Sequence, residues 1–395
     1  MVLEEALKNM PVVVLSGMRQ AGKSTLLGQL SESSNRWYVS FYDFGALESA
    51  RSNPEEFISG SQPLIIDEAQ KLPEIMTVIK REVDKRRRPG RFILSGSANF
   101  LLLKSIAESL AGRAVYLTLY PFTRRETFGL TKEEPALMHF IHNGSFPRKK
   151  TTPVRWTDVA KGGMPSVCLG DVAQPSVWFR GYEQTYLERD IRSLSQVADL
   201  VSFRHLLRLA SLRNAQVLKQ SELARDAKLN VMTTNRYLSL METSFVILRL
   251  FPHLRNRSSR LIKSPKLYLS DSGLASHLAG IKKLDVHEPL CGALLENYVA
   301  QNLLGILSSH MPEANLTYWN IQGRHEVDFI VEIGRESLAI EVKYGSRWQE
   351  RDLAGIKAYL ETAKDCRAAI LAYGGTEVLR LDDKIWAVPT SLLLT

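Results

Sequence analysis

The sequence predicts an α/β protein in which two α/β regions flank a mostly helical region. Short apolar runs alternate with helical patterns over residues 1–130, as in a parallel sheet. Residues 177–245 carry leucines and arginines at helical spacing, and residues 286–395 return to alternating strands and helices. Because a domain takes about 100–200 residues, a chain of 395 residues has room for these parts.

Composition indicates the compartment and the kind of partner. The longest apolar runs, such as Pro11–Leu15, are far shorter than the ~20 residues that a membrane helix needs. The chain begins with acidic residues where a secretory signal carries positive charge, and its three cysteines are scattered. We therefore expect a cytoplasmic protein with no membrane partner. The net charge of +9 favours a nucleic-acid partner, although an ordinary basic enzyme remains the alternative.

The first α/β region is expected to contain five strands. A nine-residue loop, Gly17–Thr25, lies between the first strand and a leucine-bearing helix and has the phosphate-loop pattern. Its glycines, Gly17 and Gly22, let backbone N–H groups turn toward phosphates, while Lys23 places charge on the β and γ groups and Ser24 ligates Mg²⁺. The expected strands are Val12–Ser16, Trp37–Asp43, Leu64–Asp67, Phe92–Ser95 and Ala114–Leu119.

Two acids complete the predicted nucleotide site. The apolar run Leu64–Ile66 predicts a buried strand, and Asp67 and Glu68 follow at its carboxyl end, where open α/β sheets bind ligands. Asp67 would hold Mg²⁺, and Glu68 would orient and deprotonate the attacking water. The chain has no Asn-Lys-x-Asp motif for reading guanine, so ATP is the expected nucleotide.

Three further residues are candidates around the nucleotide. Ser97 and Asn99 follow the strand Phe92–Ser95 and are placed to contact the γ-phosphate, or to cap a helix. Arg113 is a candidate to reach the ATP of a neighbouring subunit, which would require a homo-oligomer. The alternative is a surface arginine at a helix end.

The order of these motifs resembles the AAA-type prokaryotic ATPases that carry a C-terminal domain of unknown function. The resemblance covers nearly the whole chain and implies an AAA-like ATPase domain, a winged-helix module and a nuclease-like end. One departure from the family pattern is Met18, whose side chain we expect to point away from phosphate. Further matching motifs are Gly162–Pro165, Tyr182–Asp190, Pro265–Leu274 and Glu326–Lys343.

Four segments are expected on this basis. Residues 1–150 would form the P-loop AAA-like ATPase domain and residues 151–200 a linker and helical lid. Residues 201–285 would form a winged-helix domain, and residues 286–395 a nuclease-like α/β domain of the PD-(D/E)XK type.

The middle region has the spacing of a helix-turn-helix. A short helix at Ser221–Ala227 and a turn precede a helix that begins at Val231. A basic loop then separates the predicted strands Phe245–Leu250 and Lys266–Leu269, as in a DNA-contacting wing. A winged helix that serves only protein contacts is the alternative. The expected DNA-contacting residues are Thr234, Asn235 and Arg236 on the second helix and Arg255, Arg257 and Arg260 in the loop.

The C-terminal region carries acids in a nuclease-like order. Glu296 lies on a predicted helix, Asp328 on a strand, and Glu341 and Lys343 on the next strand, facing the same side. This arrangement resembles the PD-(D/E)XK nucleases, in which carboxylates hold Mg²⁺ for phosphodiester cleavage and a lysine assists. The alternatives are simple ion pairing at a sheet end and a domain that binds without cleaving.

Three hypotheses follow for the function. The chain is an ATPase that binds and remodels or processes DNA, including branched DNA; or it is a nucleotide-gated switch or scaffold with a silent nuclease-like docking domain; or it is a nuclease gated by ATP.

Overall fold

The computed structural model describes residues 2–96, 110–186, 191, 199–254, 263–283, 285–321 and 324–395. These residues form two compact units. The first contains Met1–Tyr120 together with Gln184–Ala198 and Thr243–Phe245. The second contains Pro121–Glu183, Asp199–Glu242 and Val246–Thr395. No helix in the described ranges is both long enough and apolar enough to cross a membrane.

The first unit contains a five-stranded parallel sheet with the strand order β2-β3-β4-β1-β5. The expected bounds are confirmed for the last three strands. The strand predicted over Trp37–Asp43 ends at Ser40, because the Asp43 side chain accepts a hydrogen bond from Ala46 N and caps the next helix. The strands are β1 (Val12–Gly17), β2 (Trp37–Ser40), β3 (Leu64–Asp67), β4 (Phe92–Ser95) and β5 (Ala114–Leu119).

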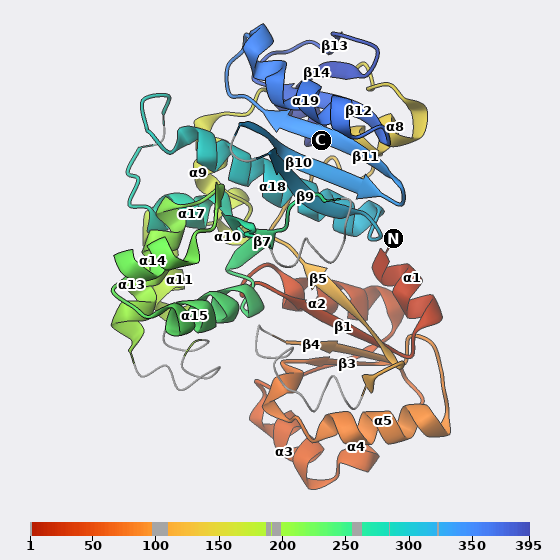
Figure 1. Cartoon of the computed structure of the whole chain (residues 1–395). Helices are drawn as coiled ribbons and strands as arrows, with labels where there is room; N and C mark the ends of the chain where they lie inside the picture. The colour runs from red at the N-terminus through yellow and green to blue at the C-terminus, as the bar shows by residue number, and fades with distance from the viewer. Residues whose placement is uncertain are drawn as a thin grey trace. The chain divides into compact units, whose positions relative to one another are not determined.

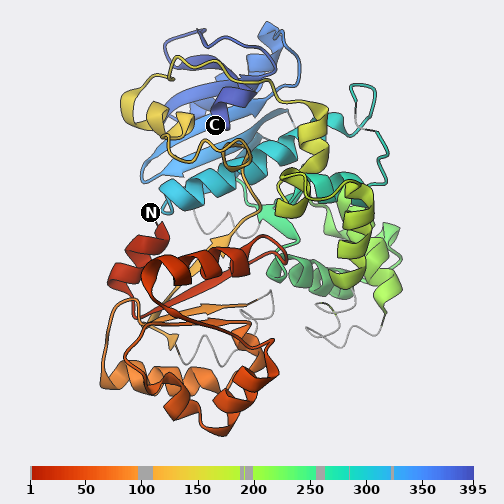
Figure 2. The same ribbon diagram turned by 180° about the vertical axis from the view of Figure 1, so that it is seen from behind.

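Helices cover both faces of this sheet (Figures 1 and 2). Alternate residues along each strand point to opposite faces, so Val12 and Ile66 belong to one core and Leu15 and Ile65 to the other. The first core packs against α3 (Phe44–Ser52), α4 (Pro54–Ser59) and α5 (Ile75–Lys85), and the second against α1 (Val2–Asn9) and α2 (Lys23–Ser34). This burial on both faces explains the apolar runs of the sequence.

The second unit contains a six-stranded mixed sheet with the order β13-β14-β12-β11-β10-β9. Strands β9, β10 and β11 pair antiparallel, whereas β11, β12 and β14 are parallel. The helices α18 and α19 lie on opposite faces (Figure 1). The bounds are α18 (Cys291–His310), β9 (Asn315–Ile321), β10 (His325–Ile333), β11 (Glu336–Val342), α19 (Ala354–Thr362), β12 (Cys366–Tyr373), β13 (Leu379–Arg380) and β14 (Ile385–Pro389).

Another part of the second unit joins three helices to a three-stranded antiparallel sheet of order β6-β8-β7. The two predicted helices of the helix-turn-helix are present as α14 and α15. The expected strand Phe245–Leu250 begins at Ile247, and Phe245 itself has a positive φ of 58°. The bounds are α13 (Leu200–Leu212), β6 (Gln216–Val217), α14 (Gln220–Asp226), α15 (Val231–Thr243), β7 (Ile247–Leu250) and β8 (Lys266–Leu269).

The domain boundaries differ from the expected ones. The N-terminal segment of the first unit ends at Tyr120, well before residue 150, and Pro121–Glu183 pack within the second unit. The region predicted as a linker is anchored there, because Gly163 N donates to the buried carboxylate of Asp271 at 2.6 Å. The short helices of this unit are α7 (Arg124–Thr127), α8 (Ala136–Asn143), α9 (Trp156–Lys161), α10 (Pro165–Cys168), α11 (Pro175–Thr185), α17 (Ser272–Leu278) and α20 (Thr390–Leu393).

Candidate active site

The phosphate loop connects β1 to α2 and depends on two glycines. Gly17 has a φ of 144°, and a Cβ there would lie 2.3 Å from the carbonyl oxygen of Leu119. Gly22 has a φ of 97° and caps the N-terminus of α2. Only glycine adopts these conformations without strain. The backbone N–H groups of the first turn of α2 therefore lie at the loop, as anion binding requires.

Lys23 begins α2 and is buried despite its charge. Its ammonium donates to the carbonyl oxygens of Gly17, at 2.9 Å, and Met18, at 2.8 Å. The Met18 side chain is only 1% exposed, so it packs into the protein as expected. Both contacts hold the positive charge at the loop. Ser24 and Thr25 follow on α2, and both are exposed.

Asp67 lies at the carboxyl end of β3, buried among polar partners. Its Oδ2 accepts a hydrogen bond from the Tyr38 hydroxyl at 2.9 Å, and its Oδ1 accepts one from Ser95 Oγ. The Ser24 side chain lies near the same hydroxyl and acts to lower the pKa of Tyr38. Burial and the neighbouring Asp67 raise the pKa of Tyr38, so its hydroxyl stays protonated.

These contacts support the predicted magnesium ligands. The Tyr38 hydroxyl donates to Asp67 and lies near Ser24, so a hydroxyl oxygen and a carboxylate oxygen lie in the same region at the edge of the sheet. Both are hard oxygen donors of the kind that Mg²⁺ prefers. The residues present therefore fit the ion that this loop type binds. Sequence reasoning missed Tyr38 and Ser95, whose strands flank β3 in the sheet.

Glu68 follows Asp67 in a left-handed backbone conformation with a φ of 57°. Gln70 Nε2 donates to its Oε2. Burial raises the pKa of Glu68, and the hydrogen bond from Gln70 partly opposes this effect. A raised pKa brings a carboxylate closer to the range in which a general base works at neutral pH.

Three other residues, Ser97, Asn99 and Arg113, were expected to lie near the nucleotide. Ser97 and Asn99 lie outside the described residues. The guanidinium of Arg113 makes two contacts with Asp84 of the same unit, at 2.6 and 2.9 Å, and donates to the carbonyl oxygen of Ala111 at 2.9 Å. This pairing favours the interpretation of Arg113 as a surface arginine; its action on a neighbouring subunit stays a prediction.

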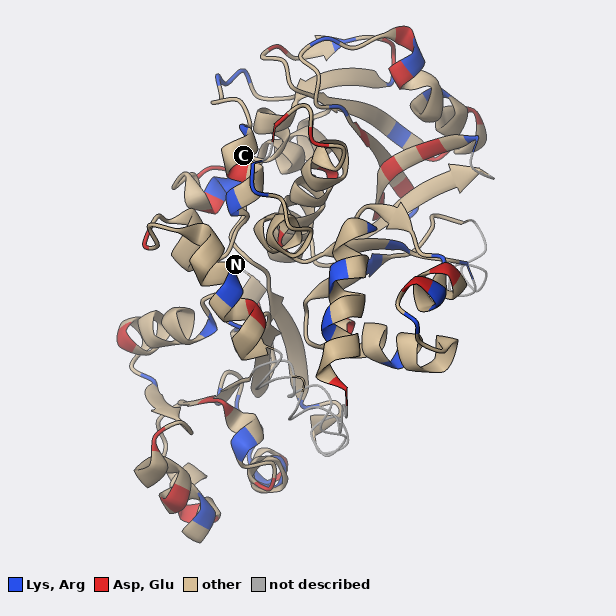
Figure 3. Ribbon diagram, turned by 90° about the vertical axis from the view of Figure 1, so that its left-hand side faces the viewer, with Lys and Arg blue, Asp and Glu red and all other residues tan. Residues whose placement is uncertain are grey.

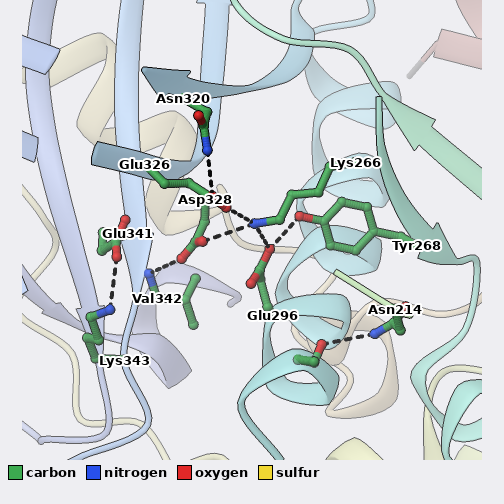
Figure 4. Close-up of polar contacts among 11 residues, drawn as sticks. Asn214, Lys266, Tyr268, Glu296, Asn320, Glu326, Asp328, Glu341, Val342 and Lys343 are labelled. Carbon is green, nitrogen blue, oxygen red and sulfur yellow. Dashed lines mark hydrogen bonds and ion pairs between the residues drawn. The ribbon is translucent and has the colours of Figure 1, made fainter. Parts of the chain in front are cut away.

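The C-terminal acids meet at one place, beside strands β10 and β11 and helix α18 (Figure 4). Acidic positions, drawn in red, also mark neighbouring strands of the sheet in Figure 3. Asp328 Oδ2 accepts a hydrogen bond from Val342 N at 2.9 Å, and Lys343 donates to Glu341 Oε1 at 2.9 Å. Burial raises the pKa of Glu296 to about 8 and that of Glu341 to about 8, and the charge of Asp328 adds to both shifts. The fold therefore brings together the four residues predicted from the sequence, Glu296, Asp328, Glu341 and Lys343.

A lysine that sequence reasoning missed lies at the centre of these acids. The side chain of Lys266, from β8, is 3% exposed, and its Nζ lies 2.6 Å from Glu296 Oε1 and 2.6 Å from Glu326 Oε1. Asp328 Oδ1 lies 3.3 Å away. Burial lowers the pKa of Lys266, but the surrounding acids and Tyr268 raise it above its ordinary value. The ammonium therefore stays charged.

The expected DNA-contacting residues of α15 differ in how far their side chains are exposed. The prediction for Thr234 is wrong, because its side chain is buried and its hydroxyl donates to the Asn230 carbonyl oxygen at 3.0 Å. Asn235 is half-buried, and Arg236 is exposed. The three loop arginines, Arg255, Arg257 and Arg260, lie outside the described residues.

Comparison with known proteins gives matches along the chain. Residues 9–128 match the AAA domain family, and residues 157–285 and 291–393 match two domains of unknown function, DUF8612 and DUF4143. The uncharacterized proteins Rv2008c of Mycobacterium tuberculosis and Mb2031c of Mycobacterium bovis are each 31% identical over 100% of this chain and 83% of their own length. The Walker-type ATPase PABY2304 of Pyrococcus abyssi matches with a TM-score of 0.40 and 16% identity, over 70% of this chain and 93% of its own.

The sheet, the phosphate loop and the AAA domain match define an ATPase of the P-loop, AAA-like type. The chain belongs to the same family as the two mycobacterial proteins.

Proposed function

We propose that this chain is a Mg²⁺-dependent ATPase that binds DNA through residues 199–269. Ser24 and Asp67 would hold Mg²⁺, which would supply positive charge against the phosphates. Lys23 binds the phosphate oxygens, and Glu68 accepts the proton of the attacking water. Tyr38 and Ser95 orient the carboxylate of Asp67 through the hydrogen bonds described above.

The element order of residues 199–269 carries the DNA part of the proposal. In the described part of residues 199–269, three helices, a short strand between the first and second helix, and two final strands in one antiparallel sheet follow the element order expected of a winged helix, which supports the proposal. In this arrangement the second helix of the helix-turn-helix, here α15, enters the major groove. Arg236 is exposed on it, and Lys228 is exposed in the preceding turn. A hollow beside α14 is lined by further basic residues, including Lys219, Arg249 and Lys263.

The proposal for the C-terminal domain is a nuclease-like fold. This proposal is supported by the order of α18, three antiparallel strands, α19 and the parallel strand β12, which is the order expected of a PD-(D/E)XK domain. The placement of Lys266 among the acids favours the hypothesis in which this domain binds or docks rather than cleaves. A nucleotide-gated scaffold with a silent nuclease-like domain is therefore the second candidate function.

Fluorescence anisotropy with labelled duplex, single-stranded and four-way DNA, at two salt concentrations, tests the DNA part. We expect Arg236→Gln to weaken binding and to reduce the slope of log K against log salt by about 0.9, the value of one phosphate contact. Arg367→Gln removes the same charge from β12 and serves as the control. Equal affinities for Arg236→Gln and the control, or no binding to any of the three DNAs, would contradict DNA binding through α15.

A further inference from the structure

The ammonium of Lys266 fills the centre of the C-terminal acid cluster (Figure 4). It can donate three hydrogen bonds, and three carboxylate oxygens lie around it. Those oxygens belong to Glu296 on α18 and to Glu326 and Asp328 on β10, at 2.6, 2.6 and 3.3 Å. The three N–H donors of the buried Lys266 ammonium therefore match, in number, the three carboxylate oxygens around it.

The carboxylates are also bound to other protein donors. The Tyr268 hydroxyl donates to Glu296 Oε1, and Asn320 Nδ2 donates to Glu326 Oε2 at 2.9 Å. Val342 N donates to Asp328 Oδ2 at 2.9 Å. These three acids are therefore held in place by the protein itself and need no added ion for the hydrogen bonds described here.

A divalent metal does not fit this arrangement. Mg²⁺ and Mn²⁺ bind carboxylate oxygens at roughly 2.0–2.2 Å, and here those oxygens surround a fixed positive charge. A second cation beside Lys266 would be repelled at short range inside a poorly hydrated site. Among the described residues, no group of three His, Cys, Asp or Glu side chains is disposed to hold a metal.

We propose that Lys266 takes the place of the metal ion in the nuclease-like site, so that the resting protein excludes divalent cations there and does not cleave DNA. The acids become a metal site only when the Lys266 side chain is removed. This inference concerns the chemistry of the C-terminal domain and holds whether or not α15 binds DNA.

The same contacts give Lys266 a structural role. The lysine belongs to the three-stranded sheet, whereas its partners belong to β10 and α18, so one side chain joins these elements. Removing one member of a buried ion pair leaves uncompensated charge and is strongly destabilising. A divalent cation that occupies the vacated position would restore the balance of charge.

Mn²⁺ titration of the full-length protein without nucleotide tests the proposal. The variants are Lys266→Ala, Lys266→Ala with Asp328→Asn, and the control Lys357→Ala, which removes an exposed lysine paired with Glu350. All of these proteins keep Ser24 and Asp67 and therefore bind Mn²⁺ weakly there. Differences in Mn²⁺ affinity between them report on the C-terminal site. We expect Lys266→Ala to gain a site at least tenfold tighter than any in wild type, and the double variant to lose it.

Melting temperatures measured with and without Mn²⁺ provide a second test, which also applies if Lys266→Ala is unstable. We expect Mn²⁺ to raise the melting temperature of Lys266→Ala and to leave that of the double variant unchanged. A folded Lys266→Ala with wild-type Mn²⁺ binding, or an unstable one that Mn²⁺ does not rescue, would overturn the proposal. The proposal would also be overturned if the wild type bound Mn²⁺ or cleaved DNA and Asp328→Asn abolished that activity.

Discussion

At the scale of single residues, the Tyr38 hydroxyl organises the nucleotide site. It donates to Asp67, from β3, at 2.9 Å and lies near Ser24, from the helix that follows the phosphate loop. Asp67 cannot shift without losing this hydrogen bond in a half-buried environment, where such a bond contributes about 0.5–1.5 kcal/mol. Tyr38 is thus a positioning residue, whereas Ser24 and Asp67 are the expected ligands.

Tyr38→Phe tests this role because it removes only the hydroxyl. We expect a loss of about 1 kcal/mol in the free energy of unfolding and a roughly tenfold rise in the Mg²⁺ concentration that gives half-maximal ATP hydrolysis. Tyr42→Phe, at a tyrosine that is 47% exposed, is the control. The measurements are urea unfolding and a magnesium titration of ATP turnover; an unchanged magnesium requirement would show that Tyr38 does not position the ligands.

Asp271 is a second residue whose environment makes a measurable prediction. Burial raises its pKa from 3.8 to about 6, although backbone N–H groups, that of Gly163 first, act to lower it. The folded protein therefore holds a proton that the unfolded chain releases. The stabilising effect is complete below pH 3.8 and disappears as the pH rises through about 6.

Asp271→Asn removes this titration. Compared with the variant, the wild type should lose about 2 kcal/mol of unfolding free energy between pH 4 and pH 6, since each unit of pKa shift corresponds to about 1.36 kcal/mol. Urea unfolding of both proteins across this range gives the difference. A difference that is constant with pH would contradict the raised pKa.

At the scale of elements, the turn at Gly162–Gly163 connects segments that are distant in sequence. Gly163 N donates to Asp271, and Gly163 O accepts a hydrogen bond from Phe122 N at 2.7 Å. A Cβ on Gly163 would lie 2.1 Å from the carbonyl oxygen of Phe122, a backbone atom that cannot turn aside. The motif is therefore a packing element of the second unit.

Gly163→Ala should destabilise the second unit by about 2 kcal/mol or more, because overpacking against backbone typically costs 1–3 kcal/mol. Gly292→Ala is the matched control, since a Cβ on Gly292 of α18 meets nothing within 4 Å. Thermal melts of both variants provide the comparison. Equal melting temperatures would show that the turn can relax.

The same elements show what the sequence could predict. The phosphate loop and the acids after β3 were found because each lies next to its own strand in the sequence. Tyr38, Ser95 and Lys266 were missed because their partners depend on strand order and on contacts across the fold. The turn formers near Gly162 resembled a linker, because their buried partner, Asp271, lies far along the chain.

At the scale of the whole molecule, each unit has its own hydrophobic core, and the phosphate loop lies in the first. Units with separate cores can unfold separately. A ligand that binds only one folded unit stabilises that unit, by about 2.7 kcal/mol at a concentration of 100 times its dissociation constant.

Differential scanning calorimetry tests this division. We expect two transitions, of which Mg²⁺ and a non-hydrolysable ATP analogue raise one. Lys23→Ala should abolish the shift, and Lys357→Ala, in the second unit, should retain it. An equal shift of both transitions would show that the units unfold together.

We propose that Glu68 activates the attacking water beside a phosphate loop that would hold ATP and Mg²⁺. Steady-state ATP hydrolysis by the wild type and by Glu68→Gln, with ATP binding measured in parallel, tests it most directly. We expect the variant to bind ATP within about threefold of the wild type and to hydrolyse it about 10²–10⁴-fold more slowly, the usual contribution of a general base. Unchanged hydrolysis in Glu68→Gln, or a wild type that binds no ATP, would contradict the account.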